Sequence, residues 1–181
     1  MNIKMIFAGY GGQGALLVGQ LLSYAAMTED KHVTWFPSYG PEMRGGAASC
    51  SVIISDKRIG SPIIQAADAV LALNQPSFDK FEKIVKPGGF IIYNSSMTDA
   101  NLKESRDDIK YIALPVSDMA SEMGNLRVAN MIALGALNEL AKCAETESII
   151  EALKLRMGDK RAELVELNKV AIEAGKNAVK Q

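Results

Sequence analysis

Apolar residues along the chain form short continuous runs that alternate with helical stripes, which is the pattern of an α/β protein. Residues 3–8 are almost continuously apolar, as in a strand buried on both faces of a parallel sheet. Residues 13–27 follow with apolar side chains three and four positions apart, which predicts a helix packed on that sheet. The chain is therefore expected to open with a strand, a glycine-rich turn and a helix.

The same alternation continues along the chain, with one interruption. Further strands are expected at residues 32–37, 68–73, 90–93 and 111–116. Residues 47–55 and a stretch near Ile59, joined by Asp56-Lys57-Arg58, are expected to form a β-hairpin that breaks the β-α order. A helix is expected up to Val85, and residues 86–89 (KPGG) are expected to turn the chain into the next strand.

The last third of the chain, from about Ser117, is expected to be helical. Ser148 and Glu151 have the spacing of a capping box, and Gly158 is expected to end that helix. The final helix carries a seam that is expected to cover either the domain's own sheet or a partner subunit: Leu164, Leu167, Ala171, Ala174 and Ala178. We predict one α/β domain over residues 1–181, Rossmann-like, with a mostly parallel sheet, an inserted β-hairpin and a helical C-terminal third.

Charge and hydropathy argue against several functional classes. The net charge of −1 provides no field that would attract nucleic acid or an anionic membrane. No window approaches the roughly 18 uninterrupted apolar residues of a membrane span, and Met1 leads directly into the first strand. We therefore expect no signal peptide, a cytoplasmic location, and neither nucleic acid nor membrane as a partner.

Cys50, Cys143 and His32 are the residues best suited to metal or thiol chemistry, and their spacing argues against it. The two cysteines are far apart, and an iron–sulfur cluster needs about four thiolates. His32 opens an apolar run and is expected to be structural. The sequence therefore predicts no metal site and no catalytic residue, and redox chemistry is expected on another molecule.

The turn after the first strand has the sequence GYGGQG, residues 9–14. Gly9, Gly11 and Gly14 satisfy G-x-G-x-x-G, which presents backbone N–H groups and a helix N-terminus to an anion. A tight strand-to-helix turn also needs glycine for geometric reasons, so a purely structural turn is an alternative to phosphate binding. The candidate ligand-binding residues here are Gly9, Gly11, Gly12, Gln13 and Gly14.

The loop after the second strand is the second candidate. A dinucleotide site would place an acid at the end of that strand, and residues 36–39 (FPSY) contain none, which disfavours NAD. The carboxyl ends of the strands meet at one edge, so the loop SYGPEMRGG should lie beside the glycine loop. Arg44 can hold phosphate oxygens in a bidentate fork, although solvation or a surface ion pair is the alternative. The candidate residues of this loop are Ser38, Tyr39, Arg44, Gly45 and Gly46.

These two loops, in this order, resemble the gamma subunit of 2-oxoacid:ferredoxin oxidoreductases. The similar segments are GYGGQG, VTWFPSYGPEMRGGAASCSVIISD and IGSPII, followed by ADAVLALNQPSFDKF and GGFIIYNSS. The resemblance covers roughly residues 3–140. The SYGPEMRGG form is most similar to the 2-oxoglutarate type, with branched-chain 2-oxoacid enzymes next.

The resemblance implies a subunit, inactive alone, of an enzyme that converts a 2-oxoacid, coenzyme A and oxidised ferredoxin into acyl-CoA, CO₂ and reduced ferredoxin. It implies thiamine diphosphate and iron–sulfur clusters on partner alpha, beta and ferredoxin-like delta subunits. It also implies that this chain engages coenzyme A. In single-chain relatives the loop that matches residues 41–46 is lysine-rich, whereas here it carries only Arg44.

Coenzyme A fits the residues, because its pyrophosphate and 3′-phosphate suit glycine-loop amides and an arginine and require no ribose-binding acid. Two other readings stay open at this point. One is a scaffold subunit of the same complex that binds no small molecule. The other is an NADP-binding reductase domain.

Overall fold

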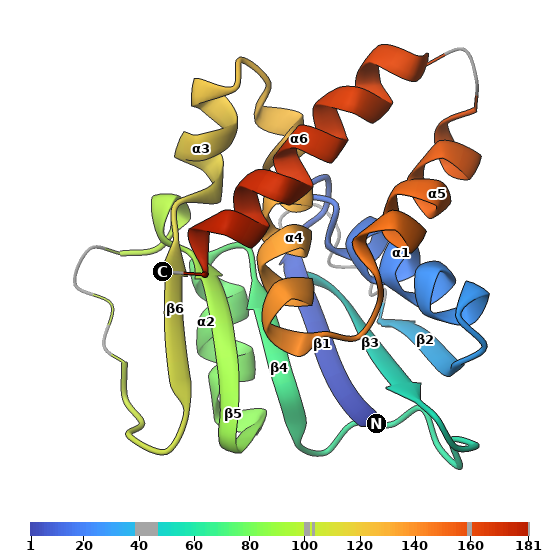
Figure 1. Cartoon of the computed structure of the whole chain (residues 1–181). Coiled ribbons are helices and arrows are strands. Elements are labelled where there is room, and N and C mark those ends of the chain that lie inside the picture. The colour runs from blue at the N-terminus through green and yellow to red at the C-terminus, as the bar shows by residue number, and fades with distance from the viewer. Residues whose placement is uncertain (39–46, 100–101, 103, 159–160, 181) are drawn as a thin grey trace.

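A computed structural model describes residues 1–38, 47–99, 102, 104–158 and 161–180. Its centre is a six-stranded sheet in the order β2-β3-β1-β4-β5-β6 (Figure 1). The strands are β1 (Asn2–Tyr10), β2 (His32–Ser38), β3 (Ala47–Ser55), β4 (Ala67–Ala72), β5 (Val85–Asn94) and β6 (Lys110–Leu114). The helices are α1 (Ala15–Thr28), α2 (Gln75–Phe81), α3 (Val116–Glu122), α4 (Ala129–Ala141), α5 (Thr146–Met157) and α6 (Ala162–Ala178). Three short 3₁₀ turns are η1 (Glu82–Ile84), η2 (Ser95–Met97) and η3 (Leu126–Val128).

The sheet is mixed, and the predicted α/β class is confirmed. β1 pairs in parallel with β4, β4 with β5, and β5 with β6, whereas β3 runs antiparallel to both β1 and β2. The predicted hairpin partner near Ile59 is wrong, because that residue lies outside any strand. The nine residues of β3 pair instead along the full length of β1, from Ala47 opposite Tyr10 to Ser55 opposite Asn2.

Residues 86–89 also differ from the expected turn, because they lie within β5. Pairing with β4 runs from Ala67 opposite Val85 directly to Ala69 opposite Phe90. The intervening residues form a bulge, in which Gly88 has φ of +77°. A glycine at positive φ lets a strand bulge out of register and then continue. The KPGG sequence, which commonly marks a turn, therefore marks an irregular strand in this protein.

Two apolar layers cover the two faces of the sheet. On one face, Phe7 and Val52 pack with residues of α1 and α4 in a large cluster that includes Leu22 and Leu134. On the other face, α2 covers a smaller cluster, in which the ring of Phe78 meets Tyr93 edge-on at 5.1 Å between centroids. Figure 1 shows α1 and α4 in front of the sheet and α2 behind it.

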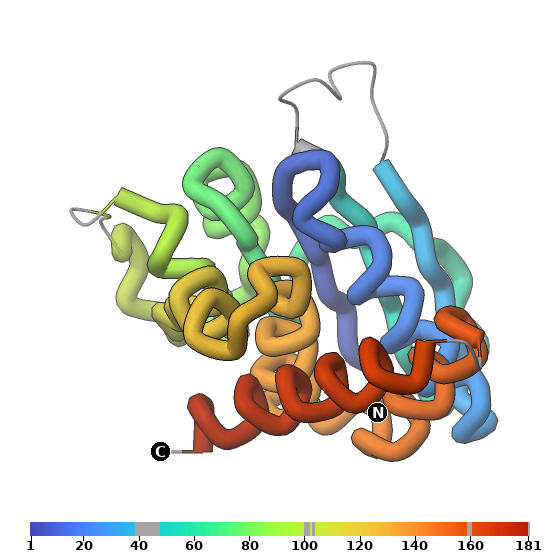
Figure 2. Tube along the Cα trace, turned by 90° about the horizontal axis from the view of Figure 1, so that it is seen from above, coloured from blue at the N-terminus to red at the C-terminus, as the bar shows by residue number. Residues whose placement is uncertain are grey.

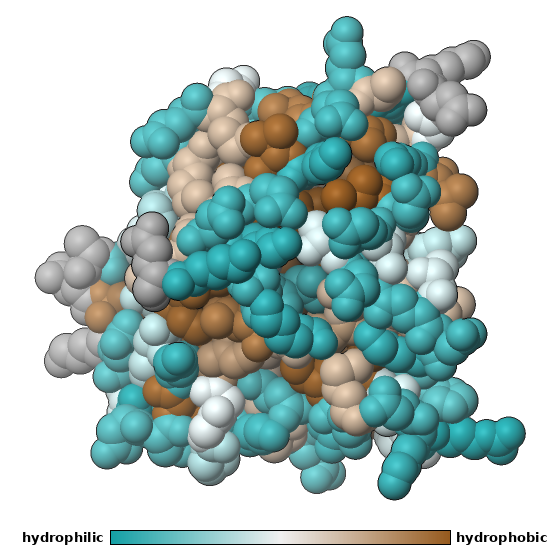
Figure 3. Space-filling model, viewed as in Figure 1, coloured by the Kyte–Doolittle hydropathy of each residue, from teal (hydrophilic) through white to brown (hydrophobic). Residues whose placement is uncertain are grey.

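The last helix, α6, packs on α4 rather than directly on the sheet, so the sheet is not the main cover of the predicted seam. Its buried stripe is Val165, Asn168, Ala171, Ile172 and Gly175, which is offset from the predicted seam. Leu164 is 40% exposed. Figure 3 shows apolar side chains at the surface between α5 and α6.

The predicted capping box at Ser148 is also wrong, because α5 begins two residues earlier, at Thr146. The carboxylate of Glu29 takes the place of a local cap: its Oε1 accepts the backbone N–H of Glu145 at 2.7 Å. Hydrogen bonds from Lys31 and Ser148 and the charge of Lys31 hold the pKa of Glu29 below its ordinary value, although burial opposes them. Gly158, with φ of +70°, ends the helix as expected.

The carboxyl ends of β1, β4, β5 and β6 lie at one edge of the sheet, and so does the end of β2. Ser38 of β2 pairs with Ser49 of β3, which pairs with Ala8 of β1. Figure 2 views this edge from above, with the loop after β1 at its centre. Among the described helices, none has the length and apolar character needed to cross a bilayer.

Candidate functional site

The glycine loop, residues 9–14, joins β1 to α1, and two of its glycines have a left-handed backbone conformation. Gly12 has φ of +97° and Gly14 has φ of +81°, a conformation that is costly for other residues. Gly14 is the N-cap of α1, and Val18 N donates to its carbonyl at 3.0 Å. The backbone of the loop therefore leads directly into the first turn of α1, whose leading N–H groups have no partner within the helix.

Gln13 anchors this loop to the neighbouring strand end. Its Oε1 accepts hydrogen bonds from Tyr10 N at 2.6 Å and from Asn74 Nδ2 at 2.9 Å. Its Nε2 donates to the carbonyl of Leu73 at 3.2 Å. A Cβ at Gly9 would lie 2.9 Å from the same Oε1, so glycine makes room for the anchor. The contacts of Gly9 and Gln13 are thus positioning contacts within the chain.

Gly14 also lies against Asn130, near the start of α4. A Cβ at Gly14 would stand 2.1 Å from Asn130 Nδ2. The N-terminal ends of α1 and α4 therefore border the same space (Figure 2). Each helix N-terminus carries a partial positive charge, so their approach favours an anion between them.

α1 and α4 differ from the other described helices in the charge of their first turns, since neither first turn has an acidic residue. α1 begins without a side-chain cap, whereas α4 continues directly from η3, which Asn125 caps by accepting Arg127 N. In contrast, Asn74 caps α2 by accepting Ser77 N, and the first turns of α3, α5 and α6 contain Asp118, Glu147 and Glu163. The two helix ends left without a negative group are the two that meet at the glycine loop.

Cavities that bind small ligands measure roughly 300–1,000 Å³. The cavity on the α4 side of the loop measures about 810 Å³. The loop, η3 and the start of α4 line it, together with Asn94 from the end of β5 and Ser117 from the first turn of α3. The described residues that line it include no aspartate or glutamate. Arg127 lines it and makes no ion pair with any residue that the structure describes. The cavity is therefore electropositive.

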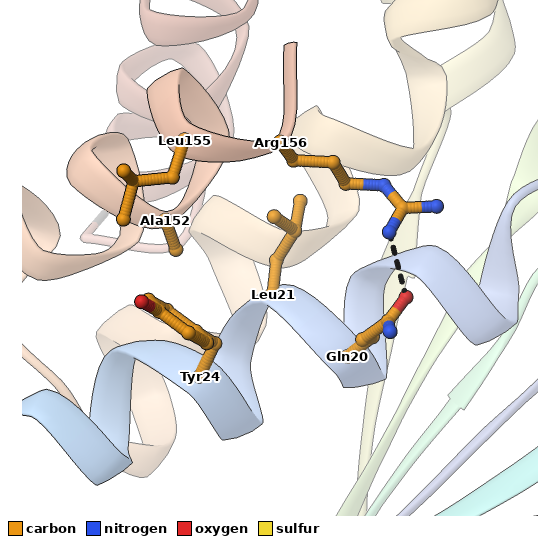
Figure 4. Close-up of a pocket in the computed structure, with 6 residues that line it drawn as sticks. All are labelled: Gln20, Leu21, Tyr24, Ala152, Leu155 and Arg156. Atoms are coloured by element: carbon orange, nitrogen blue, oxygen red, sulfur yellow. Dashed lines mark hydrogen bonds between the residues drawn. The ribbon is translucent and has the colours of Figure 1, made fainter. Parts of the chain in front are cut away.

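A smaller cavity of about 380 Å³ lies on the other side of the loop. Trp35 of β2, Leu16 of α1 and Arg156 of α5 border it. Arg156 Nη1 donates to Gln20 Oε1 at 3.0 Å, which ties α5 to α1 (Figure 4). Figure 4 also shows the adjoining apolar pocket between these helices, with Tyr24 and Leu155 at its mouth.

Ser38 is the one predicted residue of the second loop whose place the structure gives. It lies at the same sheet edge as the glycine loop, but β3 lies between its strand, β2, and β1, which leads into the loop. By its pairing with Ser49 and Ala8, it is on the α2 face of the sheet, whereas the glycine loop enters α1 on the other face. Tyr39, Arg44, Gly45 and Gly46 lie outside the described residues.

Arg127, Asn130 and Trp35 are candidate residues that the sequence patterns did not identify. Arg127 and Asn130 follow the glycine loop by more than a hundred positions and reach it only because α4 packs against α1, β4 and β5. A weak signal for them is the first turn of α4, which contains no acidic residue. For Trp35, the sequence indicated only that it lies within a strand, at residues 32–37.

Cys50 and Cys143 are both buried, and neither lines the two cavities beside the glycine loop. Burial raises the pKa of the Cys50 thiol and of the Cys143 thiol to about 12. Among the described residues, no group of three histidine, cysteine, aspartate or glutamate side chains is placed to hold a metal ion.

Neither thiol is expected to react with iodoacetamide in the native protein at pH 8, because only about one molecule in 10⁴ would carry a thiolate at either position. Mass spectrometry after a timed exposure checks this. The same protein unfolded in urea should label at both positions. Native labelling at the unfolded rate would contradict the burial of that cysteine.

A family model for pyruvate ferredoxin/flavodoxin oxidoreductases matches residues 4–178. The chain belongs to this family. It is 37% identical over 175 residues to the ketoisovalerate oxidoreductase subunit VorA of Methanothermobacter marburgensis, covering 96% of this chain and 36% of that one. The chain thus spans about a third of the length of that relative.

Two solved structures of the family are also similar. A 2-oxoglutarate:ferredoxin oxidoreductase from Magnetococcus marinus, with 2-oxoglutarate, coenzyme A and succinyl-CoA bound, superimposes with a TM-score of 0.91 at 28% identity; the match covers 99% of this chain and 31% of that one. The gamma subunit of a keto/oxoacid ferredoxin oxidoreductase from Geobacter sulfurreducens gives 0.82 at 32% identity, over 98% of both chains. The resemblance to gamma subunits found in the sequence is confirmed.

Proposed function

We propose that this chain is the gamma-type subunit of a multisubunit 2-oxoacid:ferredoxin oxidoreductase, and that it binds coenzyme A at the glycine loop. The single observation that carries the proposal is the cavity in which the glycine loop, the uncapped N-terminus of α1 and Arg127 meet with no carboxylate among the described lining residues. Coenzyme A and its thioester succinyl-CoA are the phosphate-bearing ligands named for the Magnetococcus marinus relative, and such a cavity suits the phosphates that they share.

We propose that the role of this chain in the reaction is to hold and orient coenzyme A. Backbone N–H groups of the glycine loop and of the first turn of α1 donate hydrogen bonds to the phosphates, while Gln13 fixes the loop to the end of β4. The acyl-transfer step lies on partner subunits, which carry thiamine diphosphate and iron–sulfur clusters. The pairing of this chain with such partners fits the exposed apolar side chains beside the α1–α5 pocket, where Tyr24 is 43% and Leu155 is 67% exposed.

The substrate we propose is 2-oxoglutarate, with a branched-chain 2-oxoacid as the second candidate. Support for 2-oxoglutarate comes from the loop SYGPEMRGG and from the substrate named for the Magnetococcus marinus relative. The relative from Methanothermobacter marburgensis is named for ketoisovalerate, which supports the second. Initial rates of the purified complex on a panel of 2-oxoacids, with ferredoxin as electron acceptor, separate them.

Arg44→Ala is expected to raise the KM for coenzyme A roughly 10- to 150-fold, because it removes one charge-assisted phosphate contact. A contact that holds ground state and transition state alike changes KM rather than kcat. The measurement is coenzyme A-dependent turnover of the reassembled complex. The control is the coenzyme A-independent decarboxylation of the 2-oxoacid, which should be unchanged.

The scaffold alternative predicts a different result from the same experiment. A subunit that only braces its partners would lower both reactions equally when its loop is altered, or lower neither. Either of those outcomes would replace coenzyme A binding by the scaffold role.

A further inference from the structure

We infer that the outer edge of β2 is a self-association surface, where β2 of one chain pairs antiparallel with β2 of a second copy. The two sheets then continue as one across a twofold axis. The inference goes beyond the proposed function, because it concerns contacts between copies of this chain and not the binding of coenzyme A.

β2 is the edge strand of the sheet beside β3. Its contacts with the other described helices and strands are mainly with β3 and α1 (Figure 1). Edge strands offer backbone N–H and C=O groups to other chains, and natural proteins usually block them with charged side chains, prolines, bulges or a covering segment. Residues 32–38 (HVTWFPS) contain no lysine, arginine, aspartate or glutamate. Pro37 is the one residue in this strand that commonly blocks an edge.

The direction of the backbone groups in β2 follows from the pairing of β3. Asp56 N donates to the carbonyl of Met1 at 3.1 Å, one position beyond the β1–β3 ladder. Hydrogen-bonded pairs alternate along an antiparallel ladder, so the even-numbered residues of β3 bond β1 and its odd-numbered residues bond β2. Odd positions of β3 lie opposite even positions of β2. The backbone groups of Val33, Trp35 and Pro37 therefore point away from β3.

A second copy satisfies this edge when Trp35 lies opposite Trp35 of the second copy. The two tryptophans then exchange both backbone hydrogen bonds, and the N–H of Val33 in each chain donates to the carbonyl of Pro37 in the other. Every outward N–H of the two strands has an acceptor, and the pairing runs along all seven residues of β2. Because Pro37 has no N–H, the carbonyl of Val33 is the one outward group left over in each chain.

The side chains of β2 favour the same partner. Trp35 is 37% exposed and Phe36 is 47% exposed. They lie on opposite faces of the sheet, because successive side chains of a strand alternate. In the proposed pairing, Trp35 meets its counterpart on one face, and Phe36 meets Thr34 of the second copy on the other, so both aromatic side chains become covered.

The charge and symmetry of this edge also suit a second copy. A strand without lysine, arginine, aspartate or glutamate creates no pair of like charges when it faces itself. A twofold pair uses the same patch on both chains, so neither β2 edge is left over and the association ends at a dimer.

Sedimentation equilibrium of the purified full chain measures this association. The unaltered chain is expected to approach twice its mass of 19.5 kDa as its concentration rises. Val33→Pro is expected to raise the dimer dissociation constant roughly 5- to 150-fold, because it removes one outward N–H from each copy and no N–H that bonds β3. Val33→Thr is the matched control: it keeps the side-chain shape and the N–H, so its dissociation constant should be unchanged.

Cysteine cross-linking is a second measurement, and it needs no proline in the strand. Thr34→Cys chains mixed with Phe36→Cys chains should form a disulfide between the two kinds of chain. These positions lie directly opposite each other in a pair without hydrogen bonds, where Cα atoms are about 4.5 Å apart. Each variant alone should cross-link little, since its own counterpart is offset along the second strand. Cys50 and Cys143 are buried and should not contribute.

Three results would overturn the inference. One is a full chain that stays monomeric at every concentration. Another is a Val33→Pro variant that unfolds in urea as Val33→Thr does and dimerises as tightly. The third is the absence of the mixed disulfide, whether or not Thr34→Cys cross-links with itself, because the two strands would then not pair as proposed. If Val33→Pro did not fold, the cross-linking result would decide alone.

Discussion

Gly175→Ala is expected to lower the free energy of unfolding by about 3 kcal/mol or more, although alanine is the better helix former. A Cβ at Gly175 would lie 1.8 Å from the carbonyl oxygen of Ile132, so α6 could no longer sit against α4. Gly135 makes the reciprocal close contact, with its Cβ position 1.9 Å from the carbonyl oxygen of Ile172. Both clashes are with backbone, which cannot move aside as a side-chain end can.

The control for this prediction is Asn177→Ala, two residues further along α6. Asn177 is exposed, so its replacement brings the gain in helix propensity without a clash and should be neutral or slightly stabilising. Urea unfolding of the two variants measures the difference. If Gly175→Ala were as stable as Asn177→Ala, the close packing of α6 on α4 would be wrong.

The elements of the sheet were predictable where the signal is local. The apolar run of β1, the glycine turn and the stripe of α1 lie within one short stretch, and all three were expected. The pairing of β3 was not, because a strand's partner depends on residues far away in the chain. Ile59 continued an apolar pattern nearby, whereas the actual partner, β1, lies 37 to 53 positions before the residues with which it pairs.

The candidate site shows the same division. Glycines at 9–14 mark the loop because their backbone conformations are a local property. Asn130 and Arg127 belong to it only through the packing of α4, which no local pattern records. The offset of the α6 stripe has a related cause: the close approach needs Gly175 to face the backbone of α4 and Gly135 to face the backbone of α6, and this shifts the buried face away from Leu164.

Gly14→Ala is expected to raise the KM for coenzyme A at least roughly 100-fold, the largest effect on function that the proposed site predicts. The added methyl group would lie 2.1 Å from Asn130 Nδ2, so the buried Asn130 amide would have to leave its place beside the loop. More than one phosphate contact would then be lost together. Stability should fall too, by about 1 kcal/mol for alanine at a φ of +81° and further for the clash.

Two companion variants separate these causes. Gly88→Ala carries the same backbone strain, at φ of +77°, but has nothing within 4 Å and lies at the opposite edge of the sheet. It should cost about 1 kcal/mol of stability and leave the KM for coenzyme A unchanged. Adding Asn130→Ala to Gly14→Ala leaves the nearest Asn130 atom, its Cβ, at 3.5 Å, so the stability lost to the clash should return.

Coenzyme A binding should not return in that double variant, because the methyl group still stands between the two helix ends and the Asn130 amide is gone. Unfolding curves and coenzyme A-dependent turnover of the reassembled complex give the two readouts. If Gly14→Ala matched Gly88→Ala in both stability and KM, the contact between Gly14 and Asn130 would not exist. If stability behaved as expected and the KM did not change, the loop would be a structural turn, and the glycines would serve only to bring α1 against α4.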